Sequence, residues 1–156
     1  MPAVLSAGLL PWYRDSEGLR VFLVHMGGPF WARKDTAAWS LAKGLAEAGE
    51  EDDLRAVARR EFTEEVGVPA PAGELVDLGT VRSGAKVIRA YAVEADPALA
   101  FRESNTFGLE WPPRSGRMQE FPEADRGAWL TPEEAEERIV RSQVPFLHRL
   151  RDTLGC

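Results

Sequence analysis

The most informative stretch of this chain is GLAEAGEEDDLRAVARREFTEEVGV, residues 44–68. Its second half predicts a helix on which Glu61, Glu64 and Glu65 stand at i, i+3 and i+4, so that their carboxylates share one face. Gly67 and Pro69 predict that this helix ends just after the acids, where the helix dipole disfavours negative charge. Like charges at this spacing also repel each other. A hard divalent cation such as Mg²⁺ would offset both penalties.

A solvated surface is the second interpretation of the same face. Glutamate is a good helix former, and Glu-rich helix faces with nearby Arg are common on protein surfaces. The spacing of the three acids does not separate these interpretations, whereas the residues around them do.

Those surrounding residues resemble the Nudix box, which reads Gly, five residues, Glu, seven residues, then Arg-Glu-hydrophobic-x-Glu-Glu-x-Gly-hydrophobic. Residues Arg60–Val68 fit the end of this pattern at every position, and Lys43-Gly44 resembles its opening. Softer similarity to a bacterial subgroup of unassigned substrate runs through GGPFWARKD, WSLAKG, SNTF, EWPPRSGR and FPEADRGAW. The chain therefore resembles the Nudix (MutT-like) hydrolase superfamily.

The front of the box departs from the family pattern. Counting back from Arg60 places Asp52 at the first acidic position, whereas counting forward from Gly44 places Glu50 there. Because the two counts disagree, we expect the loop over residues 46–51 to be lengthened relative to the family. The departure bears on loop geometry and on the number of metal ions.

The resemblance implies a catalytic role for the box residues in hydrolysis of a diphosphate linkage. Glu64 and Glu65 would bind Mg²⁺, or alternatively Mn²⁺, and Glu61 would be a third ligand or the general base. The backbone carbonyl of Lys43 would complete the coordination. Arg60 would orient a box glutamate rather than touch the substrate.

Later and earlier loops supply further candidates. In many members of the family an additional glutamate assists as base or ligand, and Glu120 and Glu123 are placed in the sequence to do so. Loop cations could grip phosphate through charge-assisted hydrogen bonds, and loop tryptophans could stack on a base. These candidates are Arg33, Lys34, Arg114, Arg117, Trp31 and Trp111. Ordinary surface side chains are the competing interpretation for each of them.

Bulk properties fit one globular domain over residues 1–156. The net charge of −6 argues against a nucleic-acid polymer as partner, but it is compatible with a small phosphorylated ligand if a bound metal reverses the local sign.

The single cysteine, Cys156, favours a reducing compartment, so we expect a cytoplasmic protein. The apolar start Ala3–Leu10 predicts a strand rather than a signal peptide, and no apolar run reaches membrane-spanning length. A homodimer is left open.

The pattern of apolar residues predicts an α/β fold. Turn residues divide the strands, and Thr131-Pro132 with Glu134 is typical of a helix start. The expected strands are Val4–Tyr13, Leu19–Met26, Trp39–Leu41, Leu75–Arg82 and Lys86–Glu94. The expected helices run from Asp52 or Asp53 to about Val66, from Pro132 to about Val140, and from Pro145 to Leu154, while Glu110–Pro122 is a Pro/Gly/Arg-rich segment. The resemblance implies a Nudix-type α/β/α sandwich with a mixed central sheet.

The sequence leaves three functional hypotheses and no named substrate. The favoured one is a magnesium-dependent hydrolase of a nucleotide or related diphosphate. The others are a non-catalytic ligand-sensing module on the same fold, and an acidic structural protein with a chance motif match. Some subclasses of the family carry a substrate-marking Pro or Tyr downstream of the box, and residues 81–86 contain neither.

Overall fold

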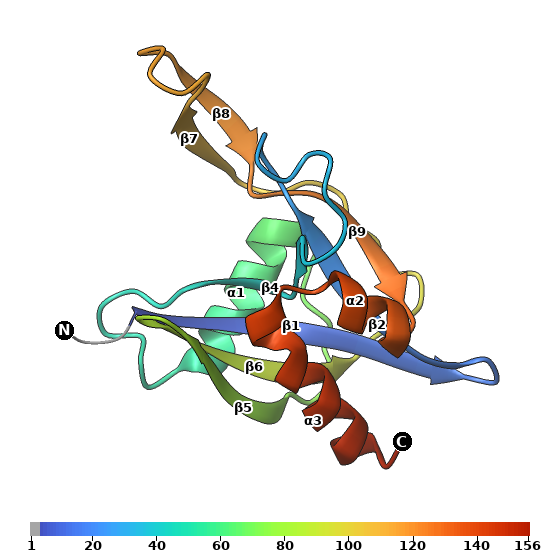
Figure 1. Ribbon diagram of the computed structural model, residues 1–156. Coiled ribbons are helices and arrows are strands. Elements are labelled where there is room, and N and C mark those ends of the chain that lie inside the picture. Colours follow the sequence, from blue (N-terminus) through green and yellow to red (C-terminus); the bar gives the residue numbers. More distant parts are fainter. Residues whose placement is uncertain (1–3) are drawn as a thin grey trace.

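A mixed seven-stranded sheet forms the centre of the molecule in the computed structural model, which describes residues 4–156 (Figure 1). Its main path has the order β3-β2-β1-β6-β5, with β4 paired to β1 and β9 paired to β2. The β1 and β6 strands run parallel and the remaining pairs are antiparallel. The strands are β1 (Val4–Asp15), β2 (Gly18–Met26), β3 (Trp39–Ser40), β4 (Ala42–Leu45), β5 (Val76–Ser83), β6 (Lys86–Glu94) and β9 (Ala124–Leu130).

The central strands are apolar on both sides because helices cover both faces of the sheet. On β1, Leu9 packs into the cluster under one helix, and the next residue, Leu10, packs into the cluster on the opposite face. On β2, Phe22 and Val21 divide in the same way. Alternate side chains of a strand point to opposite faces, so the continuous apolar runs seen in the sequence fill two separate cores.

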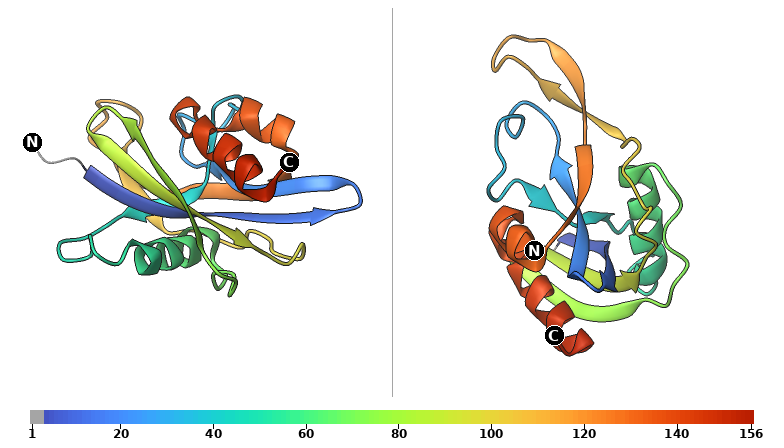
Figure 2. Two further views of the ribbon diagram at one scale, coloured as in Figure 1. Left: turned by 90° about the horizontal axis from the view of Figure 1, so that it is seen from below. Right: turned by 90° about the vertical axis from the view of Figure 1, so that its right-hand side faces the viewer.

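Three helices complete the layers. Helix α1 (Leu54–Val66) covers one face of the sheet, and α2 (Pro132–Arg138) and α3 (Val144–Leu154) cover the other, joined by the short 3-10 turn Arg141–Gln143 (Figure 2). This arrangement confirms the expected α/β/α sandwich with a mixed sheet. No helix within residues 4–156 is long and apolar enough to cross a membrane.

The ends of α1 agree with the signals in the sequence. Asp53 rather than Asp52 is the N-cap, and its side chain accepts a hydrogen bond from the backbone N–H of Ala56 at 3.4 Å. Gly67 closes the helix in the left-handed conformation with φ of 83° and donates its N–H to the carbonyl of Thr63. The helix therefore ends immediately after the acidic residues. At α2, Thr131 and Glu134 form the expected capping box.

The structure has strands in two places where the sequence did not predict them. The segment described only as Pro/Gly/Arg-rich contributes to a two-stranded hairpin of β7 (Thr106–Glu110) and β8 (Met118–Pro122), which projects from the body as an arm (Figure 1). Strand β9 was not predicted either, and of the strand expected at Trp39–Leu41 only Trp39 and Ser40 form β3, while Leu41 lies between β3 and β4. Residue 3, included in the expected apolar start, lies outside the described residues.

Candidate active site

Glu65 lies in the last turn of α1 and contacts β4. Its carboxylate oxygen Oε2 accepts a hydrogen bond from the backbone N–H of Lys43 at 2.9 Å. Burial raises the pKa of Glu65 to about 7, against the opposing effects of the Lys43 hydrogen bond and charge. A half-buried carboxylate of this kind is disfavoured as an anion unless a positive charge approaches it.

Gly44 gives the Glu61 carboxylate its position. A Cβ atom on residue 44 would collide with the carboxyl group of Glu61, so glycine here permits the close approach of that carboxyl group rather than a turn. Burial raises the pKa of Glu61; the Arg60 hydrogen bond opposes this rise, and the charge of Glu64 adds to it. Glu64 itself is exposed to solvent. The box-opening glycine and the acidic face are therefore one packed unit.

Arg60 contacts both Glu50, at the start of the box, and Glu61, near its end. Its Nη1 forms an ion pair with Glu50, and its Nη2 donates to Oε1 of Glu61 at 3.2 Å. The hydrogen bond from Arg60 lowers the pKa of Glu50, which also accepts from the backbone N–H of Glu47 at 2.8 Å. Asp52 is exposed and lies outside this network. Of the two counts along the sequence, the structure therefore selects the forward one, with Glu50 as the first box acid.

A series of backbone hydrogen bonds brings two further segments to the end of α1. The N–H of Asn105 donates to the carbonyl of Glu64 at 3.1 Å. The N–H of Glu123 donates to the carbonyl of Asn105 at 2.8 Å, and its own carbonyl accepts from Gly27 at 3.0 Å. Glu123 consequently lies near the acids, and its charge contributes to the raised pKa of Glu65. Sequence reasoning missed the part played by Asn105, because the contact is made by its backbone.

The two candidates for an additional base are placed differently. Glu123 is at the point where the arm returns to the body, beside the acidic face, whereas Glu120 lies within β8 opposite Gly108. The structure thus brings Glu61, Glu64 and Glu65 together with Glu123, and leaves Glu120 on the arm. Within residues 4–156, no three His, Cys, Asp or Glu side chains already form a group arranged to hold a metal ion.

The candidate substrate residues fall into two groups. Trp31, Arg33 and Lys34 lie on the β2–β3 loop, residues 27–38. The backbone N–H of Gly27, the first residue of this loop, donates a hydrogen bond to the carbonyl of Glu123. The Lys34 ammonium is 5.4 Å from the Trp31 ring centroid. Arg114 and Arg117 lie in the loop joining β7 to β8 at the far end of the arm, away from α1 (Figure 1).

The arm is connected to the β2–β3 loop by aromatic contacts. The Trp111 ring packs edge-on against Phe30 with centroids 5.3 Å apart. Closer to the body, the Phe107 ring lies directly over Gly28, where a Cβ atom would be 3.0 Å from the ring. Trp111 therefore supports the junction between the arm and this loop.

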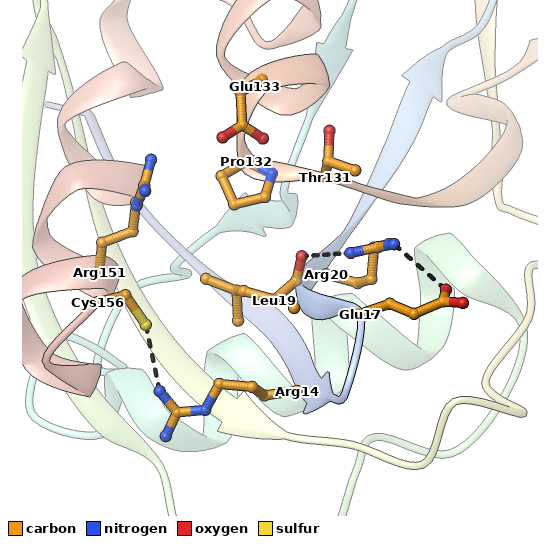
Figure 3. Close-up of a pocket in the computed structure, with 10 residues that line it drawn as sticks. Arg14, Glu17, Leu19, Arg20, Thr131, Pro132, Glu133, Arg151 and Cys156 are labelled. Carbon is orange, nitrogen blue, oxygen red and sulfur yellow. Dashed lines mark hydrogen bonds and ion pairs between the residues drawn. The ribbon is translucent and has the colours of Figure 1, made fainter.

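Two cavities of the described chain contain no residue of the acidic face. One, of about 350 Å³, lies where the β1–β2 turn meets α2 and the end of α3 (Figure 3). Arg14, Arg20 and Arg151 line it together with Glu17 and Glu133, so the basic and acidic charges largely offset each other. The other, of about 550 Å³, is a mainly apolar hollow between residues 68–71 and 95–102. The acidic residues Glu61, Glu64 and Glu65 lie instead on α1, outside both cavities.

Fold and site together define a mixed α/β sandwich whose loop-helix unit, residues 43–67, presents three glutamates of α1 next to β4. The family model of the NUDIX domain matches residues 4–150. This chain therefore belongs to the NUDIX family. Comparison with curated protein sequences gives no significant match.

Solved structures share this fold at low sequence identity. The binary complex of the Caenorhabditis elegans Ap4A hydrolase has a TM-score of 0.63 and 18% identity, covering 97% of this chain and 98% of that one. The NUDIX domain of Shewanella oneidensis NrtR complexed with ADP ribose has a TM-score of 0.65 and 15% identity, covering 99% and 90%. The MutT protein of Methanosarcina mazei has a TM-score of 0.58 and 18% identity, covering 99% and 97%. At these identities the similarity establishes the fold.

Proposed function

We propose that this protein is a metal-dependent hydrolase that cleaves a diphosphate linkage in a nucleotide or nucleoside diphosphate derivative. The observation that carries this proposal is the acidic face of Glu61, Glu64 and Glu65, packed against Gly44 and joined by Glu123. Membership of the NUDIX family supports it, as do the names of two structural neighbours, an Ap4A hydrolase and a MutT protein.

The donor set suits Mg²⁺, with Mn²⁺ as the alternative. Glu64 and Glu65 would hold the ion, Glu61 would be a third ligand, and the Lys43 carbonyl would complete the set. All four donors are oxygens, which these hard cations prefer, and the pKa of Glu65 is raised by burial and by the charges of Glu123 and Glu61, which a bound cation would offset. Once bound, such an ion neutralises charge on phosphoryl oxygens and acidifies a water molecule.

The remaining side chains have separable tasks. Glu123 is exposed beside the acids, so it can accept a proton from the attacking water; Glu61 is the alternative base. Arg60 is occupied by Glu50 and Glu61, which makes it an orienting residue rather than a phosphate ligand.

Substrate contacts are assigned to the β2–β3 loop. Arg33 and Lys34 can pair with phosphate oxygens, and the Trp31 ring can stack on a base. The attachment of the first loop residue, Gly27, to Glu123 supports this assignment, since it keeps the loop next to the acids. We expect a small-molecule substrate rather than a nucleic-acid polymer, given the net charge of −6, and a cytoplasmic enzyme acting as a monomer or homodimer.

Product release from a panel of phosphorylated compounds tests the proposal. Nucleoside di- and triphosphates, dinucleoside polyphosphates and nucleotide sugars are incubated with Mg²⁺ and either the wild-type protein, Glu64→Gln, or the matched control Glu74→Gln, an exposed acid outside the site. We expect metal-dependent turnover of at least one compound by the wild type and by Glu74→Gln. Equal turnover by Glu64→Gln would overturn the metal-ligand role.

A ligand-sensing module is the second candidate function, because one structural neighbour is a NUDIX domain complexed with ADP ribose. Saturable binding of a compound from the same panel, without turnover at any Mg²⁺ or Mn²⁺ concentration, would favour it. If neither binding nor an Mg²⁺-dependent rise in melting temperature occurs, the acidic face is a solvated surface.

A further inference from the structure

His25, near the end of β2, is a completely buried titratable side chain that the proposed chemistry does not use. Its exposed fraction is 0%. Its Nδ1 atom lies 2.8 Å from Oδ1 of Asp125 on β9, and its Nε2 atom lies 2.6 Å from the carbonyl oxygen of Lys34. The ring therefore bridges the last strand of the sheet and the β2–β3 loop.

Both of these neighbours are hydrogen-bond acceptors. A backbone carbonyl cannot donate, and an ionised carboxylate cannot either. A neutral imidazole carries one N–H, so it would leave one buried contact without a proton, whereas the imidazolium ion donates to both oxygens. Arg126 Nη1 lies 3.7 Å from the Asp125 carboxylate, whose side chain is 29% exposed.

The other charged groups around the ring are engaged elsewhere. The Lys34 ammonium lies over Trp31, and the Arg126 guanidinium stacks on Trp39 at 5.3 Å. Asp35 accepts from the Trp39 indole at 2.7 Å and pairs with Arg138 at 3.3 Å. Trp39 itself packs edge-on against the His25 ring. Asp125 is thus the carboxylate side chain that hydrogen-bonds the ring.

We propose that His25 is a positioning residue whose imidazolium form fastens the β2–β3 loop to β9. The loop is held at its start by the Gly27–Glu123 hydrogen bond and near its end by the His25–Lys34 bond. Between these two points lie Trp31 and Arg33. The inference rests on the proposed function, because it assigns His25 the task of keeping the substrate-contacting loop beside the acidic face.

Nitrogen NMR of the imidazole rings tests the protonation state without any substrate. The chain contains two histidines, and replacing the exposed His148 by Gln leaves His25 as the one imidazole signal. We expect both ring nitrogens of His25 to be protonated at neutral pH. A single neutral tautomer under these conditions would overturn the proposal.

Asp125→Asn gives the sharper comparison. The amide of an asparagine can donate to Nδ1, so a neutral ring with its proton on Nε2 then satisfies both contacts. In the His148→Gln background we expect Asp125→Asn to convert His25 to that neutral tautomer while the Lys34 bond persists. A ring that stays doubly protonated in this variant would show that Asp125 is not its counter-ion, which would also overturn the proposal.

His25→Gln tests the effect on the loop. Loss of the charge-assisted bridge should raise amide hydrogen exchange of residues 33–35 and raise KM by roughly tenfold, with kcat changed by less than about twofold. His148→Gln is the control and should match the wild type in both. If the His25→Gln protein is folded and the amide hydrogen exchange of residues 33–35 is unchanged, His25 does not position the loop. Amide hydrogen exchange is measured without substrate, so it tests the role of His25 independently of the proposed function. Failure of the proposed function would appear instead as absence of turnover by the wild-type protein.

Discussion

The end of α1 and the arm both carry predicted site residues, and the structure supports these two regions in opposite ways. At the end of α1 the backbone carbonyls are taken by a neighbouring segment: Val66 accepts from Arg102 and Glu103 at 2.9 and 3.2 Å, and Glu64 accepts from Asn105. In the arm, β7 and β8 pair with each other alone, and Met118 is 70% exposed.

This difference separates residues that need fixed geometry from residues that do not. Metal ligands and a base must be held within narrow limits, and the acidic face has backbone and side-chain partners on several elements. A two-stranded hairpin without a core beneath it is marginally stable, so the arm is expected to open at a lower free energy than α1. Variants on α1 should therefore affect the reaction far more than variants on the arm.

The largest effect is expected from Glu64→Gln. The substitution keeps the size of the side chain and removes a charged oxygen ligand on an exposed position of α1, so folding should be preserved. We expect kcat/KM for the substrate found in the panel to fall at least about 100-fold, measured at saturating Mg²⁺. Glu74→Gln should remain within twofold of the wild type. A similar loss in both variants would mean that the acids act through net charge and not as a site.

Gly44→Ala compares a glycine at the acidic face with one in the arm. The added methyl group would overlap the Glu61 carboxylate, and we expect a loss of about 1–3 kcal/mol in the free energy of unfolding together with reduced activity. Gly108→Ala on β7 meets only ordinary contact with Met118 at 3.5 Å, so its stability should change by less than about 0.5 kcal/mol. Urea unfolding of both variants measures the difference; equal stability would show that Glu61 simply moves aside.

Glu65→Gln tests the half-buried acid through the pH dependence of stability. The folded pKa of about 7 lies above the ordinary glutamate pKa of 4.5, so between these pH values the folded state holds a proton that the unfolded state has released. Stability of the wild type therefore falls as pH rises from about 4.5 to 7. Glutamine has no such penalty and should be more stable than the wild type by on the order of 1–2 kcal/mol at pH 8 in EDTA, with little difference at pH 4.5. Parallel pH profiles of unfolding would contradict this.

Features set by neighbouring residues could be predicted from the sequence, whereas features set by contacts between distant residues could not. Periodicity and caps are local, so α1 with its Asp53 and Gly67 ends, and α2 with its capping box, were predictable from neighbouring residues. The choice between Asp52 and Glu50 required the Arg60 contact, which depends on the course of a loop. The choice of Glu123 over Glu120 depends on backbone bonds between residues far apart in the chain.

The arm was missed for a related reason. Strand β7 alternates apolar residues such as Phe107 and Leu109 with polar ones or glycine, but β8 (MQEFP) does not alternate, and each strand has only five residues. Such a short alternation is weak evidence for a strand. His25 carried no signal at all, because Asp125 is 100 residues away in the sequence.

The smallest effect is expected from the arm tip. Arg114 and Arg117 are exposed in the loop between β7 and β8, where water and salt screen their charges from a ligand held at α1. The double variant Arg114→Ala, Arg117→Ala should therefore change KM by less than about threefold, whereas Arg33→Ala on the β2–β3 loop should raise it by roughly tenfold. Steady-state kinetics with the substrate from the panel measures both. A tenfold rise in the arm variant, with kcat unchanged, would mean that the arm closes over the acidic face when substrate binds, and that the two regions form one site only in the complex.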